Sequence, residues 1–178
     1  GRGRCECGVL MAELKRGGAR APLAGRGVNY IGPTILEFGT EAQKVKWLPI
    51  CARGEGAWAM GYSEPGAGSD LASLSTRAVK EGDHYRIRGQ KIFISWGDHD
   101  MTDNIVHMVL ARTPDAPDGS RGVSLFIVPK FLVNSNGSLG ARNDLRCISL
   151  EDKLGIHACP TCVMSFGDSD GAIGYLVG

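Results

Sequence analysis

Two short segments carry the residues whose types and spacing could do chemistry. Residues 61–70 read GYSEPGAGSD, and residues 89–97 read GQKIFISWG. Pro65 fixes its own φ, while Gly66 and Gly68 permit left-handed backbone angles that would turn successive N–H groups toward one side. A concavity lined by N–H groups attracts oxyanions, so the first segment is a candidate phosphate-binding loop.

The side chains of these segments suit a flat cofactor that carries phosphate groups. Ser63, Ser69 and Ser95 offer hydroxyls that can donate or accept hydrogen bonds, and Phe93 with Trp96 offers ring faces for stacking. The ordinary alternative is a Pro-Gly turn with local serine caps, followed by a strand end packed in a hydrophobic core. The residues alone leave both interpretations open.

Both segments also resemble the two flavin-binding signatures of acyl-CoA dehydrogenases. A third stretch, residues 153–168 (KLGIHACPTCVMSFGD), closed by residues 174–178, resembles the end of that family's middle β-domain. With residues 39–49 (GTEAQKVKWLP), the resemblance runs from about residue 31 to the last residue. Three ordered motifs over most of the chain make this a specific signal.

The resemblance implies that FAD is the cofactor and that both segments contact it. Ser63 would lie near the pyrimidine end of the flavin, where a donor stabilises the reduced ring, and Ser95 would hydrogen-bond N5. The family commonly has tryptophan at the position of Phe93 and threonine at that of Ser95, so a ring face and a hydroxyl are both retained. The implied cofactor contacts are Met60, Tyr62, Ser63, Gly68, Ser69, Phe93, Ile94 and Ser95, and Ser69 is also the implied substrate contact.

The family's reaction is α,β-dehydrogenation of acyl-CoA thioesters. A glutamate removes the α proton while the β hydrogen leaves as hydride to flavin N5. In the family that glutamate lies on a helical domain after the β-domain, whereas Glu64 belongs to the flavin loop and Glu151 precedes a strand. We therefore expect no catalytic residue in this chain, which would be inactive alone. The implied partners are an acyl-CoA substrate, electron-transfer flavoprotein or a similar acceptor, and further copies in a homo-oligomer.

Two alternatives share the same motifs. A non-catalytic β-domain could keep the fold and serve as an interaction module, although the hydroxyls at Ser63, Ser69 and Ser95 count against it. Flavin-dependent acyl-CoA oxidases and nitroalkane oxidases share the fold and overlapping motifs. The sequence downstream of this domain would separate these functions.

Neither a metal site nor an independent acid–base site is predicted. Residues 159–162 (CPTC) with His157 supply only part of a tetrahedral zinc site, because Cys5 and Cys7 are distant and differently spaced. Residues 98–100 (DHD) could couple a carboxylate to an imidazole. Three adjacent polar residues after a strand favour a solvated loop instead.

Composition excludes several classes of function. The 178 residues carry 20 basic and 19 acidic side chains, a formal charge of +1, so nothing global indicates nucleic acid or an anionic membrane as a partner. No leader segment is evident, and no apolar run has the length of a membrane span. The six cysteines are not spaced like a secreted disulfide framework, so we expect a cytoplasmic setting.

Helical signals are confined to the front of the chain. Residues 1–30 show little periodicity beyond a weak helix at 9–16. Pro33 suits the first turn of a helix that Gly39 would close, and Thr40 with Gln43 forms a capping box for a helix over 41–48. After Gly54 an apolar period of two predicts strands over 74–79, 85–88, 92–95, 105–111, 122–129, 145–150 and 162–166. Turns are expected at 81–83, 88–90 and 136–137.

Short strands without intervening helices predict a mainly β fold: an antiparallel β-barrel or sandwich preceded by a short α-helical segment. Neither 25–30 nor 66–71 completes the Gly-x-Gly-x-x-Gly pattern of a Rossmann unit, so a β-domain must hold FAD by another geometry. By resemblance, residues 1–53 are the C-terminal part of an N-terminal helical domain, poorly defined over 1–30, and residues 54–178 are the middle β-domain.

Overall fold

The computed structural model of the chain describes residues 4–19 and 25–178. Its helical elements are α1 (Arg4–Arg16), the π-helical turn η1 (Gly27–Ile31), α2 (Gly32–Phe38), α3 (Glu41–Arg53) and the 3₁₀ turns η2 (Leu71–Ser73) and η3 (Ser120–Gly122). Its strands are β1 (Ala57–Gly61), β2 (Arg77–Glu81), β3 (His84–Ser95), β4 (Ile105–Ala111), β5 (Ser124–Pro129), β6 (Phe131–Val133), β7 (Leu139–Arg142), β8 (Leu145–Leu150), β9 (Thr161–Phe166) and β10 (Ala172–Leu176).

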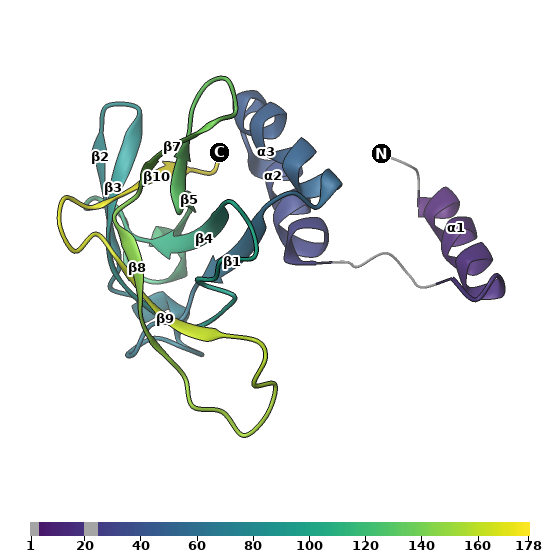
Figure 1. The fold of residues 1–178 in the computed structure, drawn as a ribbon. Coiled ribbons are helices and arrows are strands. Elements are labelled where there is room, and N and C mark those ends of the chain that lie inside the picture. Colours follow the sequence, from purple (N-terminus) through teal and green to yellow (C-terminus); the bar gives the residue numbers. More distant parts are fainter. Residues whose placement is uncertain (1–3, 20–24) are drawn as a thin grey trace.

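The strands form a mostly antiparallel sheet in the order β1-β4-β5-β10-β3-β9-β8, with β2 also paired to β3. Within this order, β1 and β4 run parallel. The separate β6–β7 hairpin turns at the predicted Asn136-Gly137, where Gly137 has φ 85°. Helices α2 and α3 lie together beside the strands (Figure 1). The predicted fold class, mainly β with a preceding helical segment, is confirmed.

Strand β3 connects the two halves of the sheet. Its first half pairs with β2 and β10, and its second half, from Gly89 onward, pairs with β9. The tight connection predicted at residues 88–90 is therefore wrong, because the strand continues through it. Gly89 permits this continuation: its φ is 155°, and an added Cβ would lie 2.9 Å from both Cα and Cβ of Thr76. The turn predicted at 81–83 is present, with Gly82 at φ 61°.

The capping box before α3 is confirmed. The Gln43 N–H donates to Thr40 Oγ1 at 3.2 Å, and the Thr40 N–H donates to Gln43 Oε1 at 3.0 Å. The helix continues through Pro49 to Arg53, past the predicted end, and stops at Gly54 with φ 70°. Helix α1 is also longer than the predicted 9–16.

The strand predictions were incomplete. The strand expected from residue 74 begins only at Arg77, because residues 71–73 form η2. Strands β1, β6, β7 and β10 were not predicted. In β1 and β10 the sequences AWAMG and AIGYL mix small and large residues without clear alternation.

Two apolar clusters hold the fold together. One joins the helices to the sheet and includes Ile31, Ile35, Trp47, Trp58, Met108 and Ile127. The other lies between the strands and includes Ile87, Ile94, Phe126, Met164 and Phe166. Trp47 meets Trp58 edge to face, with ring centroids 6.0 Å apart. Both faces of β4 are covered, so its sequence IVHMVLA is apolar almost throughout.

A buried ion pair lies between the end of β1 and the middle of β3. Lys91 is 0% exposed and Glu64 is 4% exposed, and Lys91 Nζ lies 2.8 Å from Glu64 Oε1. The Glu64 carboxylate also accepts the N–H and hydroxyl of both Ser75 and Thr76. Lys91 Nζ donates further to the Tyr62 carbonyl oxygen at 3.1 Å. A buried charge needs such partners, so this network fixes residues 62–64 to β3.

The network also sets the ionisation of its members. Burial would raise the pKa of the Glu64 carboxyl, but hydrogen bonds from Lys91, Thr76 and Ser75 outweigh burial and lower this pKa to about 2. Burial lowers the pKa of Lys91, although Glu64 opposes that shift. Glu64 is therefore a carboxylate at neutral pH.

Substituting Gly89→Ala tests the role of Gly89 in β3. We expect the free energy of unfolding to fall by about 2 kcal/mol, because the methyl group overpacks against Thr76. Gly66→Ala is the matched control, since no atom lies within 4 Å of its added Cβ. Urea unfolding measures both. Equal stability of the two variants would contradict this account of β3.

Glu64→Gln tests the buried ion pair. At pH 7 the variant should lose at least about 3 kcal/mol of unfolding free energy, because Lys91 keeps a buried charge without its partner. The folded-state pKa of the Glu64 carboxyl lies below its ordinary value of 4.5. The stability that the ionised carboxylate gives to the fold is therefore fully present above pH 4.5 and is lost as the pH falls toward about 2. The difference in unfolding free energy between the variant and the wild type should therefore be smaller at pH 3 than at pH 7, by about 2 kcal/mol. A difference that stays constant between pH 7 and pH 3 would show that the ionised pair does not supply this stability.

Candidate functional site

The two predicted segments meet in space. The Ile92 N–H donates to the Ser63 carbonyl oxygen at 2.8 Å, so the chain leaving β1 lies against β3 three residues before Ser95. Ser63 and Ser95 are thus brought to nearby positions at the same end of β3.

Three hydroxyls of the site have no internal partner. Within the described part of the chain, no hydrogen bond involves the hydroxyl of Ser63, Ser69 or Ser95. The nearby Ser75 hydroxyl, by contrast, donates to Glu64 at 2.7 Å. The three hydroxyls are therefore free to bind a ligand.

The Pro65-Gly66 segment forms a tight turn. The Glu64 N–H donates to the Ala67 carbonyl at 2.8 Å, and the Ala67 N–H donates back at 3.1 Å. The predicted left-handed angles are wrong, because neither Gly66 nor Gly68 has a positive φ. An added Cβ at either glycine would have no atom within 4 Å. These glycines thus leave open surface beside the turn. They do not turn successive backbone N–H groups toward one side, as was expected from the sequence.

Positive φ angles occur instead at the end of β3. Phe93 has φ 59° and Trp96 has φ 58°, and the β3–β9 register shifts between Lys91 and Ile94. The irregularity leaves the Phe93 side chain 62% exposed and that of Ile94 2% exposed. A non-glycine residue in this region costs about 1–3 kcal/mol, and such strain is frequent at ligand sites. No sequence pattern predicted it.

The predicted contacts therefore differ in what they can offer. Phe93 presents an exposed ring, while the side chain of Ile94 lies in the core and leaves only its backbone for a ligand. Met60 and Tyr62 are half-buried. Burial raises the pKa of the Tyr62 hydroxyl, which packs beside the helix-facing core.

A pocket of about 650 Å³ reaches Trp96, the residue after Ser95, although none of the predicted flavin contacts lines it. It is bounded by η1, the end of α3, the start of β1 and the loop after β3, and its lining includes Arg26, Trp58, Trp96, His99 and Met101. The Arg26 guanidinium donates to the Ser95 carbonyl at 3.4 Å, which connects this pocket to the serine. Sequence reasoning did not identify Arg26, because the two residues are distant in the chain.

Residues 98–100 form the predicted loop after β3, with Asp98 and His99 half-buried and Asp100 exposed. Asp98 accepts from Lys130 Nζ at 2.6 Å, and His99 meets Trp96 edge to face at 5.7 Å between centroids. Burial, followed by the charge of Lys130, lowers the pKa of His99. The Asp98 carboxylate thus pairs with a lysine, which does not favour an aspartate–histidine catalytic couple.

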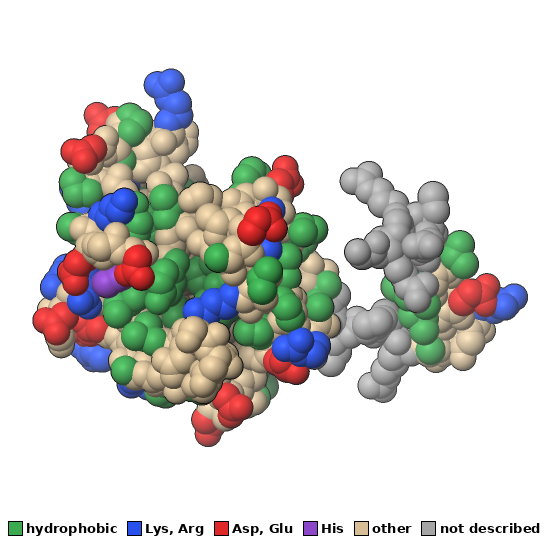
Figure 2. Space-filling view, turned by 90° about the horizontal axis from the view of Figure 1, so that it is seen from above, with side chains coloured by type: hydrophobic (Ala, Val, Ile, Leu, Met, Phe, Trp, Pro, Cys, Tyr) green, Lys and Arg blue, Asp and Glu red, His purple; other side chains and the backbone are tan. Residues whose placement is uncertain are grey.

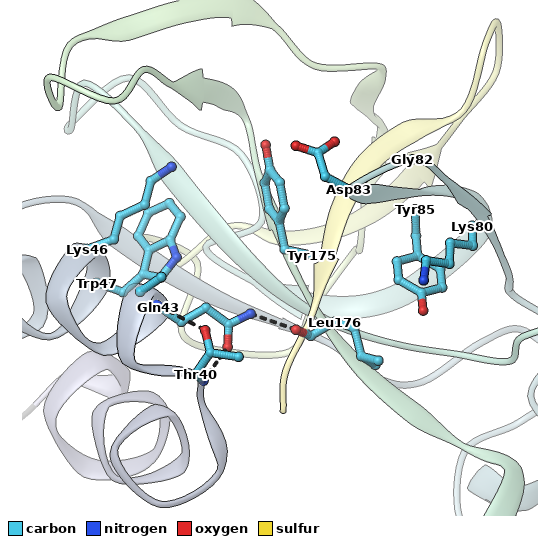
Figure 3. Close-up of a pocket in the computed structure, with 11 residues that line it drawn as sticks. Thr40, Gln43, Lys46, Trp47, Lys80, Gly82, Asp83, Tyr85, Tyr175 and Leu176 are labelled. Carbon is cyan, nitrogen blue, oxygen red and sulfur yellow. Dashed lines mark hydrogen bonds between the residues drawn. The ribbon is translucent and has the colours of Figure 1, made fainter.

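A second pocket, of about 430 Å³, lies where α3 meets β10 and the β2–β3 turn (Figure 3). Seen from above, apolar side chains gather in a hollow of the molecule with acidic and basic groups at its rim (Figure 2). The Gln43 side-chain amide donates to the Leu176 carbonyl at 2.6 Å, and Lys46 Nζ lies 5.8 Å from the Tyr175 ring centroid. None of the predicted flavin contacts lines this pocket, which separates it from the candidate site.

The cysteine segment holds no metal cluster. Across the described residues, no group of three or more His, Cys, Asp or Glu side chains is placed to bind a metal ion. Cys51, Cys147, Cys159 and Cys162 are free thiols, and the side chains of Cys5 and Cys7 lie outside what the structure describes. None of the helices in the described ranges is long and apolar enough to cross a membrane.

Comparison with known proteins agrees with the motifs. The family model "Acyl-CoA dehydrogenase, middle domain" matches residues 59–169, and "Acyl-CoA dehydrogenase, N-terminal domain" matches residues 1–55. The chain is 52% identical over 141 residues to 3-methylmercaptopropionyl-CoA dehydrogenase of Ruegeria pomeroyi, an alignment that covers 79% of this chain and 24% of the relative. It thus spans about a quarter of that relative's length.

Solved structures show the same fold. An acyl-CoA dehydrogenase from Geobacillus kaustophilus aligns with a TM-score of 0.68 and 37% identity, covering 88% of this chain and 38% of the other. A chain from the structure of the electron transferring flavoprotein of Acidaminococcus fermentans aligns with a TM-score of 0.62 and 34% identity, covering 83% and 35%. By sequence and by structure, this chain belongs to the acyl-CoA dehydrogenase family.

Proposed function

We propose that this chain supplies the flavin-contact surface of an FAD-dependent acyl-CoA dehydrogenase that oxidises acyl-CoA thioesters between the α and β carbons. One observation carries the proposal: the unpaired hydroxyls of Ser63 and Ser95 belong to two segments joined by the 2.8 Å hydrogen bond from the Ile92 N–H to the Ser63 carbonyl, and the exposed Phe93 ring lies on the same strand as Ser95. The open surface at Gly66 and Gly68 leaves room beside them. These features fit a flat ring with polar edges.

Each residue has a separate part in binding. Ser63 would hydrogen-bond the pyrimidine end of the flavin, Ser95 would hydrogen-bond N5, and Phe93 would cover one ring face. Gly68 and the exposed Ser69 would contact the phosphate side, and Ser69 would also meet the substrate. Met60, Tyr62 and Ile94 would contribute mainly backbone. Bound FAD would supply the hydride acceptor that no side chain of this chain can replace.

The carboxylate that removes the substrate proton would come from outside this chain. Glu64 is unsuitable, because it is buried, accepts hydrogen bonds from Lys91, Ser75 and Thr76, and has a pKa of about 2. A general base needs a pKa nearer to the working pH and access to the substrate. We infer that residues 1–53 end an N-terminal helical domain and that residues 54–178 form the middle β-domain of a longer enzyme.

The proposed partners follow from this role. An acyl-CoA is the proposed substrate, in line with the name of the Ruegeria pomeroyi relative. Electron-transfer flavoprotein or a similar acceptor is the proposed oxidant of the reduced cofactor, and the similarity to a chain from the Acidaminococcus fermentans structure supports it. We further propose that the complete enzyme is a homo-oligomer.

Replacing both site hydroxyls tests the flavin surface. The chain should quench the fluorescence of added FAD, and Ser63→Ala with Ser95→Ala should weaken binding about tenfold, because two hydrogen bonds to the ring are lost. Ser135→Ala with Ser138→Ala, in the β6–β7 turn, is the matched control and should bind like wild type. Equal affinity of all three proteins would contradict the assigned surface.

Because the proposed catalytic carboxylate lies outside this chain, the chain alone should not oxidise a substrate, whereas a hybrid enzyme should. When the 141 aligned residues of this chain replace the matching segment of the Ruegeria pomeroyi relative, the purified hybrid should be yellow and should bleach with an acyl-CoA under anaerobic conditions. The 178-residue chain mixed with FAD should not bleach. Turnover by the isolated chain would place the base within it, and a colourless hybrid would argue against the flavin site.

A further inference from the structure

The structure assigns a role to Lys91 beyond stabilising the core: we propose that it is the positioning residue of the flavin surface, holding the Tyr62 carbonyl and thereby setting where Ser63 lies relative to Ser95. This inference rests on the proposed flavin function. Lys91 is 0% exposed, so it would act through the loop backbone and not by touching the cofactor.

The contacts of Lys91 identify it as a bridge between the two segments. Its Nζ donates to Tyr62 O at 3.1 Å and lies 2.8 Å from Glu64 Oε1. The next residue, Ile92, donates its N–H to Ser63 O at 2.8 Å. Two consecutive residues of β3 therefore hold two consecutive carbonyls of the loop. The same strand carries Phe93 and Ser95, so one rigid element places both halves of the site.

The lysine itself has little freedom to move. Its carboxylate partner accepts an N–H and a hydroxyl from each of Ser75 and Thr76, which fixes the carboxylate in place. Its aliphatic stem is packed, since a Cβ added at Gly61 would lie 3.5 Å from Lys91 Cγ and 3.2 Å from Val109. The ammonium thus has one defined position from which to hold the loop.

Stability alone does not explain this pair. Removing two charges from water is costly, and a buried ion pair can often be replaced by apolar residues of similar volume without loss of stability. What an apolar side chain at position 91 could not do is donate a hydrogen bond to Tyr62 O. We therefore attribute the lysine at position 91 to the hydrogen bond that fixes the position of the Tyr62 carbonyl.

The test compares stability with flavin affinity in the 178-residue chain. Lys91→Met and Glu64→Gln are made singly and together, and each protein is melted and titrated with FAD. The single variants should lose stability, whereas the double variant should melt within a few degrees of wild type because no unpaired charge remains. Its FAD affinity should nevertheless stay about tenfold below wild type, or about 1.4 kcal/mol. Amide NMR shifts of Tyr62 and Ser63 should move with the affinity.

A second ion pair on the same strand is the control. Arg86 Nη2 lies 2.9 Å from Glu81 Oε1, and neither residue contacts the loop. Arg86→Met with Glu81→Gln should leave FAD affinity unchanged. If the double variant at positions 64 and 91 does not fold, Glu64→Asp is tested in its place. The shorter side chain of aspartate should draw the Lys91 ammonium away from the Tyr62 carbonyl. FAD binding should then weaken severalfold.

The outcomes separate this inference from the proposed function. Recovery of both stability and affinity in the double variant, or wild-type affinity in Glu64→Asp, would overturn the positioning role while leaving the flavin function intact. A hybrid enzyme, with this chain's matching residues in the Ruegeria pomeroyi relative, that binds no FAD would overturn the proposed function, and the inference with it. Weak affinity in a stable double variant, with the control unaffected, supports the role of Lys91.

Discussion

The buried contact between Lys91 and Glu64 is the constraint on which the candidate site depends. It joins the loop that leaves β1 to the middle of β3 at 2.8 Å, inside a core that excludes water from both charges. Because an ion in such a place must be fully paired, the surrounding backbone has one arrangement and not several. The loop and the strand end thus form a single surface, although the described residues contain no Rossmann unit to organise a dinucleotide.

Rigidity at this point allows strain nearby. Phe93 and Trp96 adopt positive φ angles, and the register of β3 against β9 shifts between Lys91 and Ile94. The cost is about 1–3 kcal/mol for each residue, which the paired strand and the core around Ile94 can sustain. With this backbone the Phe93 ring is exposed while the side chain of Ile94 remains in the core. Adjacent residues of one strand therefore supply surface for binding and packing for stability.

Local chemistry was predictable from the sequence, and long-range geometry was not. The capping box at Thr40 and the turn at Gly137 depend on neighbouring residues and were recognised. The continuation of β3 through Gly89 depends on Thr76 packing against it, and the ion pair of Asp98 depends on Lys130, so no local pattern could reveal them. The proposed site residues were predicted through motif resemblance, but the hydrogen bond from Arg26 to the Ser95 carbonyl became visible only in three dimensions.

The most direct measurement is a crystal structure of this chain, or of the hybrid enzyme, with FAD bound. The account predicts a flavin ring against Phe93, with the hydroxyls of Ser63 and Ser95 within hydrogen-bond distance of its polar edge and Lys91 still bonded to Tyr62 O. A flavin seated in the pocket between α3 and β10, or density that leaves Ser63 and Ser95 without contact to the ring, would contradict it.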